Sequence, residues 1–278
     1  MVFGRRVLHG FALVGLSGFL IAYGMVHMVP RGRAAPVAAW EGRSVPGALA
    51  GAVAPARAPG RIRPSAAAVV IWRVATGTPD VALTFDDGPD PTNTPVVLAA
   101  LRRYHAVATF FVLGRQAERY PELTRAMAQG GSEVCSHGYA HTMLRGQSPA
   151  AVTAEVERTA TVLRRIGVGG CRLFRFPYFA SDETARHVVA ALGYRAIAAS
   201  VDPQDWRGGT GQRIARQVFA ELRPGDIILL HDGGGRRRAT LAGLDLILAG
   251  LADRGLQTVT VTQLLADARG RASSVAAR

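Results

Sequence analysis

Two adjacent carboxylates, Asp86 and Asp87, end the apolar segment Val81–Phe85 and are followed by Gly88-Pro89. The segment is rich in strand-forming residues, so the aspartates lie where a buried strand becomes a loop. Neighbouring side chains of an extended chain point to opposite sides. One carboxylate can therefore bind a metal ion while the other acts as a base. An ordinary Asp-Asp-Gly-Pro turn is the alternative interpretation, and this segment alone does not decide between them.

Two histidines, His137 and His141, lie four residues apart in the chain. Their imidazoles can converge on one ion if the loop turns helically, because such positions share a face. Pairs with this spacing also arise by chance in a chain with seven His. Together with Asp87, the pair makes a set of two imidazoles and one carboxylate. Three protein ligands are typical of catalytic metal sites, which leave room for water and substrate.

Three further strand-like segments each carry a polar side chain at or near their end. Arg175 interrupts an apolar run, where it is costly to bury unless it meets a carboxylate. Asp205 lies beside Trp206 after a short apolar segment, and His231 ends another apolar run. Each of these residues alone is usually structural or solvated. Five successive segments that end in polar clusters indicate a shared site.

The ordered set resembles the polysaccharide deacetylases with a NodB-homology domain, carbohydrate esterase family 4. Five motifs of that family follow one another between about residues 79 and 267: Thr-Phe-Asp-Asp-Gly-Pro at 84–89, His-x3-His at 137–141, Arg-x-Pro-Tyr at 175–178, Asp-Trp at 205–206 and Leu-x-His at 229–231. The resemblance implies an α/β fold, a distorted (β/α) barrel with fewer than eight repeats. It also implies a metal-dependent hydrolase that removes acetyl groups from an N-acetylated polysaccharide.

The resemblance gives each motif residue a role. Asp86 would be the general base, and Arg175 would orient it. His231 would be the general acid, and Asp205 would orient it. Three residues would hold one divalent cation, for which Zn²⁺ fits best: Asp87, His137 and His141. Tyr178 would face the substrate and stabilise the oxyanion through its backbone N–H. Trp206 and Leu229 would also face the substrate.

The chain departs from the family's pattern at a few positions. Gly138 stands where Ser or Thr is usual, which removes a hydroxyl that could brace the metal-binding loop, and Phe179 replaces the usual Gly. The ionisable set remains complete. The glycan stays open among peptidoglycan, chitin-like oligomers and poly-N-acetylglucosamine. The alternatives are an esterase of O-acetylated, xylan-type glycans and a catalytically silent carbohydrate-binding barrel.

Strand and helix patterns alternate around these motifs, which predicts a mainly parallel α/β fold. Polar groups at the carboxyl ends of the strands match the active face of a (β/α) barrel. A last strand is expected near Gln257–Val261. Helices are expected over 94–104, 115–129, 149–166, 182–192, 210–222 and 239–253.

The first 78 residues differ in kind from the rest. Arg5 and Arg6 precede an apolar run over 7–29, long enough for a membrane anchor within residues 1–30. A cleavable signal sequence is the alternative. Residues 31–78 are rich in Ala, Pro and Arg and are expected to form a linker, and 268–278 a flexible tail. These features predict an extracytoplasmic domain, either anchored or secreted.

The net charge of +13 does not predict nucleic-acid binding. Residues 1–78 carry nine Arg and one Glu, so much of the excess lies outside the motif region. The chain contains no Lys, which indicates a compositional bias rather than a nucleic-acid surface. The expected partners are therefore the glycan and, through residues 7–29, a membrane. The oligomeric state stays open.

Two cysteines, Cys135 and Cys171, lie just before the second and third motifs. The predicted fold places them on neighbouring strands. We expect two buried free thiols, because cross-strand disulfides are geometrically demanding. An extracytoplasmic location keeps the disulfide as the alternative.

Overall fold

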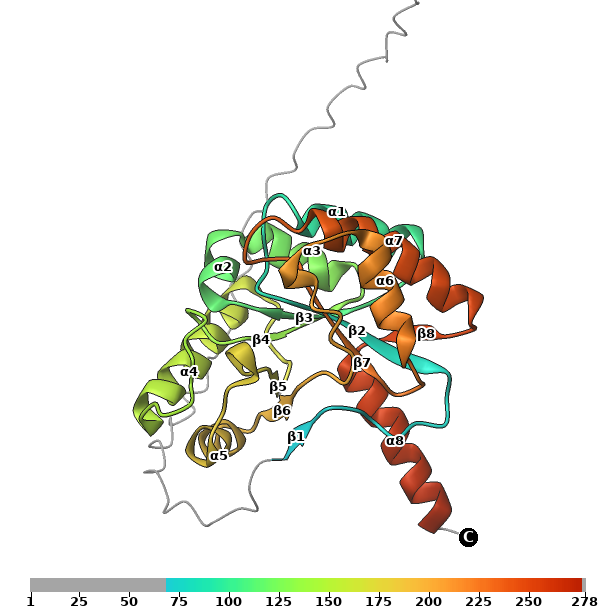
Figure 1. Cartoon of the computed structure of the whole chain (residues 1–278). Helices are drawn as coiled ribbons and strands as arrows, with labels where there is room; N and C mark the ends of the chain where they lie inside the picture. Colours follow the sequence, from blue (N-terminus) through green and yellow to red (C-terminus); the bar gives the residue numbers. More distant parts are fainter. Residues whose placement is uncertain (1–68, 277–278) are drawn as a thin grey trace, which may run out of the picture. The chain divides into compact units, whose positions relative to one another are not determined.

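The computed structural model describes residues 69–276, in which strands and helices alternate along the chain (Figure 1). The strands are β1 (Val70–Ile71), β2 (Asp80–Asp86), β3 (Thr109–Val112), β4 (Glu133–Ser136), β5 (Leu173–Phe174), β6 (Arg195–Ile197), β7 (Ile227–His231) and β8 (Gln257–Val259). They pair in parallel in the order β1-β6-β5-β4-β3-β2-β7, with β8 alongside β2. This arrangement confirms the predicted distorted (β/α) barrel.

The six predicted helical ranges match observed helices closely, whereas the C-terminal helix was not predicted. The observed helices are α1 (Thr94–Arg103), α2 (Gly114–Arg119), α3 (Pro121–Gln129), α4 (Pro149–Ile166), α5 (Glu183–Ala191), α6 (Gly211–Ala220), α7 (Arg238–Asp253) and α8 (Val261–Ala276). The single helix expected over 115–129 is two helices. Pro121 lacks an N–H and stands in the first turn of α3, where that donor is not needed.

The barrel closes through two isolated bridges rather than through a further strand. Arg73, just after β1, pairs antiparallel with Asp226, just before β7. Val201, which follows β6, pairs in parallel with Ile228 of β7. The Arg73 guanidinium also forms an ion pair with the fully buried carboxylate of Asp226. These contacts join the two ends of the sheet.

Alternating side chains of β2 divide between two cores. Val81, Leu83 and Phe85 join the outer core with α1, α6 and α7, which lie together on one side of the sheet (Figure 1). Ala82 joins the inner core, where apolar residues at the start of α8 also pack. Because side chains alternate along a strand, Thr84 and Asp86 share the inner face with Ala82. The candidate base therefore points into the barrel.

The described region extends beyond the expected domain boundaries. Val70–Ile71 was expected to lie in the linker 31–78, but it forms β1 and pairs with β6. Residues 268–276 were expected in a flexible tail and belong to α8. Short apolar or Ala-rich segments carry too little pattern to be assigned from sequence alone. None of the helices within 69–276 has the length and apolarity needed to cross a bilayer. The expected membrane segment, 7–29, lies outside the described residues.

The expectation of free thiols is wrong, because Cys135 and Cys171 form a disulfide. Cys135 lies within β4, and Cys171 lies two residues before β5. The two strands pair in parallel through Ser136 and Phe174. This pairing brings the Cα atoms to 5.3 Å, within the usual range for a disulfide. The sequence could not supply that separation.

Candidate active site

The candidate catalytic residues lie at the carboxyl ends of neighbouring strands. Asp86 ends β2 and His231 ends β7, and the two residues pair directly in register. His137 follows β4, and Arg175 follows β5. Parallel strands end at one rim of the barrel, so residues far apart in the chain meet there. The register places the candidate base and acid side by side.

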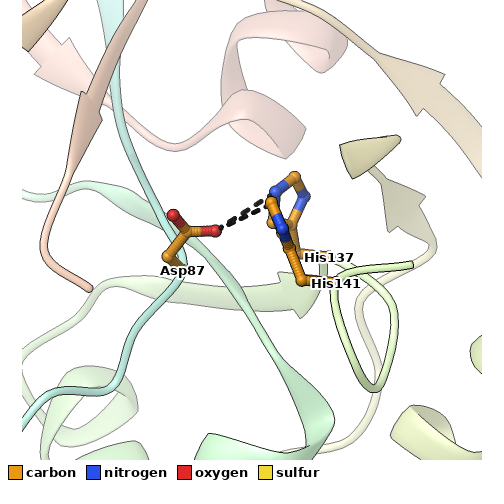
Figure 2. A group of neighbouring side chains, drawn as sticks. All are labelled: Asp87, His137 and His141. Carbon is orange, nitrogen blue, oxygen red and sulfur yellow. Dashed lines mark ion pairs between the residues drawn. The ribbon is translucent and has the colours of Figure 1, made fainter. Parts of the chain in front are cut away.

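The three predicted metal ligands face one another, as Figure 2 shows. Asp87 Oδ1 lies 3.6 Å from His137 Nε2 and 3.2 Å from His141 Nε2. All three ligand atoms lie within 4.8 Å of one another. Asp87 Oδ1 is buried and has no hydrogen-bond partner among the described residues. A buried carboxylate oxygen without a partner is costly, so this set fits a divalent cation.

Hydrogen bonding fixes how His137 presents its ring. Its Nδ1 lies 2.9 Å from the carbonyl oxygen of Arg175, and an Nδ1–H donated to that carbonyl leaves Nε2 as the free acceptor toward Asp87. Burial lowers the pKa of His137 to about 3, so the imidazole is neutral at ordinary pH. A neutral imidazole whose other nitrogen donates to a carbonyl is the usual form of a metal-binding histidine.

Arg175 is fully buried and orients Asp86. Its Nη1 donates to Asp86 Oδ1 at 2.7 Å and to Thr84 Oγ1 at 2.8 Å, and its Nη2 donates to the Ala198 carbonyl at 3.0 Å. The guanidinium also lies over the Phe111 ring, 4.1 Å from its centroid. Pairing with a carboxylate offsets part of the cost of burying the guanidinium. The other oxygen, Asp86 Oδ2, faces His137 Nε2 at 3.7 Å.

The pKa of Asp86 is set by burial more than by its pairing with Arg175. Burial raises the pKa of Asp86 above its usual value, and this effect outweighs the opposing charges of Arg175 and His231. Desolvation disfavours the charged form of a carboxyl group, whereas a neighbouring cation favours it. A raised pKa makes the carboxylate a stronger base, as a catalytic base requires.

The Asp205 carboxylate contacts both the backbone N–H and the ring of His231. Its Oδ1 lies 2.7 Å from His231 Nδ1, while Oδ2 accepts the backbone N–H of His231 at 2.9 Å and the Thr240 hydroxyl at 2.7 Å. Burial disfavours the charged imidazole, but the hydrogen bond and charge of Asp205 outweigh it and raise the pKa of His231. The ring therefore carries a proton at neutral pH more readily than a free histidine.

These groups line one pocket of about 460 Å³. Of the ten site residues predicted from sequence, only Arg175 and Asp205 do not line it, and they lie behind Asp86 and His231. Tyr178 and Trp206 are largely exposed at this pocket, whereas Leu229 is buried in its wall. Left-handed backbone conformations occur at four lining residues, which are Asp87, His141, Tyr178 and Phe179. Such conformations are costly for residues other than Gly and cluster at functional sites.

Comparison with known proteins places the chain in a family. The family model described as "Polysaccharide deacetylase" matches residues 73–197. A chitooligosaccharide deacetylase of Azorhizobium caulinodans is 35% identical over an alignment covering 66% of this chain and 93% of that protein. This chain belongs to the polysaccharide deacetylase family. The family predicted from the motifs is thus confirmed.

Two further members of the polysaccharide deacetylase family extend the likeness. A peptidoglycan-N-acetylglucosamine deacetylase of Bacillus cereus is 35% identical and covers 70% of this chain and 92% of its own length. The solved structure of a family 4 carbohydrate esterase from Streptomyces lividans, in complex with acetate, is 35% identical with a TM-score of 0.61. It covers 66% of this chain and 93% of its own. The relatives are thus matched over nearly their whole lengths.

A glutamate that the motifs do not reveal braces the loop that carries the candidate metal ligands His137 and His141 of this deacetylase. Glu155 of α4 accepts the backbone N–H groups of Tyr139 and Ala140 at 2.7 and 3.0 Å and the Thr142 hydroxyl at 3.2 Å. Gly138 itself has no side chain that could brace this loop. A Cβ added at Gly138 would lie 3.0 Å from Glu155 Oε2, so the glycine leaves room for this carboxylate.

Replacing Glu155 with alanine should weaken metal binding by on the order of tenfold, because the loop that carries His137 and His141 loses its hydrogen bonds. Calorimetric titration of Zn²⁺ into the chelator-treated protein measures the effect. Glu157 of the same helix is exposed and provides a matched control, Glu157→Ala. Equal affinities in the two variants would contradict the brace.

Sequence reasoning missed three further residues at the site. Thr84 lies within the first motif, and the alternation of β2 could have placed it beside Asp86. Thr240 and Arg237 lie outside the motifs, and no sequence signal marks them. Arg237 donates from Nε to the Gly233 carbonyl at 2.6 Å and places Nη2 3.9 Å from Asp87 Oδ2. It thus links the loop after His231 to the candidate metal ligand Asp87.

A larger cavity of about 760 Å³ lies at the opposite ends of the strands. Its lining includes Glu133 and Arg195, which begin β4 and β6, and Cys171. Glu133 lies near both cysteines, but their sulfurs are joined in the disulfide and are not available as thiolate ligands. This cavity therefore does not offer an alternative metal site to the pocket at the carboxyl ends of the strands.

Proposed function

We propose that this protein is a metal-dependent hydrolase that removes acetyl groups from an N-acetylated glycan, with N-acetylglucosamine-type cell-wall or extracellular polymers as the substrate class. The observation that carries the proposal is the register of Asp86 and His231, which places a base and an acid side by side at the three-ligand cluster. Relatives named as chitooligosaccharide and peptidoglycan-N-acetylglucosamine deacetylases support this substrate class.

Asp87, His137 and His141 would hold the cation, and Zn²⁺ fits two imidazoles and one carboxylate best. When bound, the cation polarises the acetyl carbonyl and acidifies water. The protein supplies the geometry of the ligands and a partly buried pocket around them. Leu229 in the pocket wall and Trp206 at its edge would contact the acetyl methyl group, and the Tyr178 backbone N–H would donate to the oxyanion.

Asp86 acts as the general base in this mechanism. It removes a proton from the water whose oxygen forms a bond to the acetyl carbon, and Arg175 holds the carboxylate in place. The carbon–nitrogen bond then breaks, which releases acetate. His231 gives its proton to the departing nitrogen, so the product is an amine rather than an unstable amide anion. Asp205 keeps that imidazole protonated and correctly turned.

The pH dependence of kcat/KM tests the role of His231 as the proton donor. Activity requires its protonated form and is lost as pH rises through its raised pKa. Asp205→Asn removes the charge and acceptor that raise this pKa, so the alkaline limb should move to lower pH. Asp202→Asn is the control, since that exposed carboxylate also lines the pocket but does not bond His231. An alkaline limb unmoved by Asp205→Asn would require a different acid.

Acetate release from a panel of glycans tests the proposed function directly. Chitin oligomers, peptidoglycan and acetylated xylan are incubated with the protein as prepared, after chelation, and after Zn²⁺ is added back. We expect release from N-acetylated glycans that chelation removes and Zn²⁺ restores. Release from xylan alone would favour the O-acetyl esterase. Glycan binding with no release from any substrate would favour the silent barrel.

We further propose that the deacetylase domain acts outside the cytoplasm, attached through residues 7–29 and the linker, or secreted if that segment is cleaved. The apolar run after Arg5 and Arg6 supports attachment. The disulfide between Cys135 and Cys171 supports an oxidising compartment. Protease accessibility of a C-terminal tag on intact cells and spheroplasts tests both. A full-length protein recovered entirely from the soluble cytoplasmic fraction would contradict the proposal.

A further inference from the structure

Arg237 faces the candidate metal ligand Asp87 from the loop between β7 and α7. It is buried and lines the pocket around Asp86 (the catalytic pocket). Its Nη2 lies 3.9 Å from Asp87 Oδ2, whereas Asp87 Oδ1 lies 3.6 Å and 3.2 Å from the Nε2 atoms of His137 and His141. The two oxygens of this carboxylate therefore face different groups, one the ligand cluster and the other a guanidinium.

Missing side chains in the loop make this close approach possible. A Cβ added at Gly234 would lie 2.7 Å from Asp87 Oδ2 and 2.8 Å from Arg237 Nη2, so it would press against both partners. Gly234 also has a φ of 72°, in the left-handed region that other residues adopt at a cost. A Cβ at Gly233 would lie 2.2 Å from the carbonyl oxygen of Asp87. The loop therefore requires glycines where it meets the carboxylate.

Hydrogen bonds fix the direction of the Arg237 guanidinium. Its Nε donates to the Gly233 carbonyl at 2.6 Å, and its Nη2 donates to the Gly234 carbonyl at 3.3 Å. Among the ion pairs of residues 69–276, Asp87 is its only acidic partner. A planar guanidinium held by two carbonyls presents its remaining donors in a defined direction. The charge beside Asp87 Oδ2 is thus held in place by the loop.

The loop itself is held by bonds that do not involve the Arg237 side chain. The backbone N–H of Gly233 donates to the Asp86 carbonyl at 3.3 Å. Asn93 Nδ2 donates to the Gly235 carbonyl at 2.9 Å. Replacement of Arg237 should therefore remove the charge beside the carboxylate and leave the loop in place.

A charge in this position restricts how a carboxylate can bind a metal ion. A carboxylate can bind a cation through one oxygen or through both. A guanidinium beside one oxygen stabilises negative charge there and competes with the cation for that oxygen. The outer partner of a ligating side chain also fixes how the ligand is presented. With Oδ2 facing Arg237, Asp87 offers Oδ1 to the cation, and the carboxylate lies between the two positive groups.

We propose that Arg237 is a positioning residue that restricts Asp87 to a single ligand oxygen and so keeps a coordination position of the cation open for water and substrate. The inference rests on the proposed function in taking Asp87, His137 and His141 as the ligands. Arg237 acts on the cation through Asp87, so its effect needs no substrate. Its removal should let Oδ2 turn to the cation and raise the number of coordinating atoms.

The visible absorption of Co²⁺, added to the chelator-treated full chain in place of Zn²⁺, tests this role without substrate. Co²⁺ absorbs strongly in four-coordinate sites and more weakly as the coordination number rises, so its spectrum reports coordination. Arg237→Met should reduce the absorption per bound ion. Gly234→Ala inserts a methyl group between the two partners and should do the same. A merely structural effect that withdrew Asp87 from the cation would add no ligand atom.

Two variants provide matched controls. Arg236→Met replaces the exposed neighbouring arginine. Gly193→Ala adds a methyl group at another left-handed glycine, where the Cβ would have open space around it. Both should keep the wild-type spectrum. The kcat for acetate release should fall by on the order of tenfold in Arg237→Met and stay unchanged in Arg236→Met.

A wild-type spectrum of bound Co²⁺ in either Arg237→Met or Gly234→Ala would overturn the positioning role. A reduced absorption in Arg236→Met equal to that in Arg237→Met would overturn it as well. Acetate release by the unaltered protein with Zn²⁺ is measured in parallel. Spectra that change as expected without any acetate release would overturn the proposed function and support the positioning role. Acetate release combined with unaltered spectra in the variants would overturn the positioning role alone.

Discussion

Replacing Asp86 with asparagine is expected to reduce the rate of acetate release by roughly a hundredfold to ten-thousandfold, the usual contribution of a positioned general base. The asparagine amide cannot take the proton from water. It keeps nearly the shape of the carboxylate and an oxygen for Arg175 Nη1. Metal affinity should persist, because Asp87 and the two histidines are unchanged. The measurements are kcat for a defined N-acetylglucosamine oligomer and metal content after dialysis.

Asp202→Asn serves as the matched control, because it removes an exposed carboxylate from the lining of the same pocket. A thermal unfolding curve for each variant shows whether it is folded, since Arg175 loses a buried charged partner in Asp86→Asn. A folded, metal-loaded Asp86→Asn protein that retains most of its activity would remove Asp86 from the role of base.

His137→Ala should abolish metal retention and acetate release together. The imidazole supplies one of three ligands and is held by the Arg175 carbonyl, so its loss leaves only two of the three ligand side chains. A two-ligand site should lose metal affinity by more than a hundredfold, beyond the effect of losing a residue that merely orients a ligand. His141→Ala is expected to behave in the same way. Metal analysis after dialysis and acetate release with added Zn²⁺ measure both effects.

His187→Ala provides the control for loss of an imidazole, because His187 lies on α5 and does not line the catalytic pocket. It should retain both metal and activity. Either metal-ligand variant that kept its full metal content would remove that histidine from the ligand set. Activity that persisted in the metal-free variants would contradict metal dependence itself.

The periodic parts of the fold could be read from the sequence. Apolar runs such as Val81–Phe85 and the helical pattern over 149–166 correspond to β2 and α4. The closure of the barrel could not be read from the sequence. It depends on single-residue pairings, Arg73 with Asp226 and Val201 with Ile228, which join positions far apart in the chain. A bridge of one residue leaves no local pattern, and β1 is too short to show one.

The candidate site divides in a similar way. Its ionisable residues lie in short motifs, whose order could be read because each follows an apolar run. Thr240, Glu155 and Arg237 reach the site from helices or loops through contacts that only the tertiary fold creates. The direction of the pKa shift of Asp86 could not be read from the sequence for a related reason. The sequence shows that Arg175 is available as a partner, but it does not show how completely the pair is buried.

The effect of a substitution at Gly138 depends on the residue at position 155, and the reverse also holds. A serine at 138 would have to adopt the left-handed backbone of this glycine and place its Cβ 3.0 Å from the glutamate. Loss of the glutamate alone would leave the loop amides of Tyr139 and Ala140 without their acceptor. Exchanging this brace for a hydroxyl within the loop therefore requires both changes, and either single mutant is a weakened intermediate. Grafting the loop into a relative should succeed only when the glutamate is transferred with it.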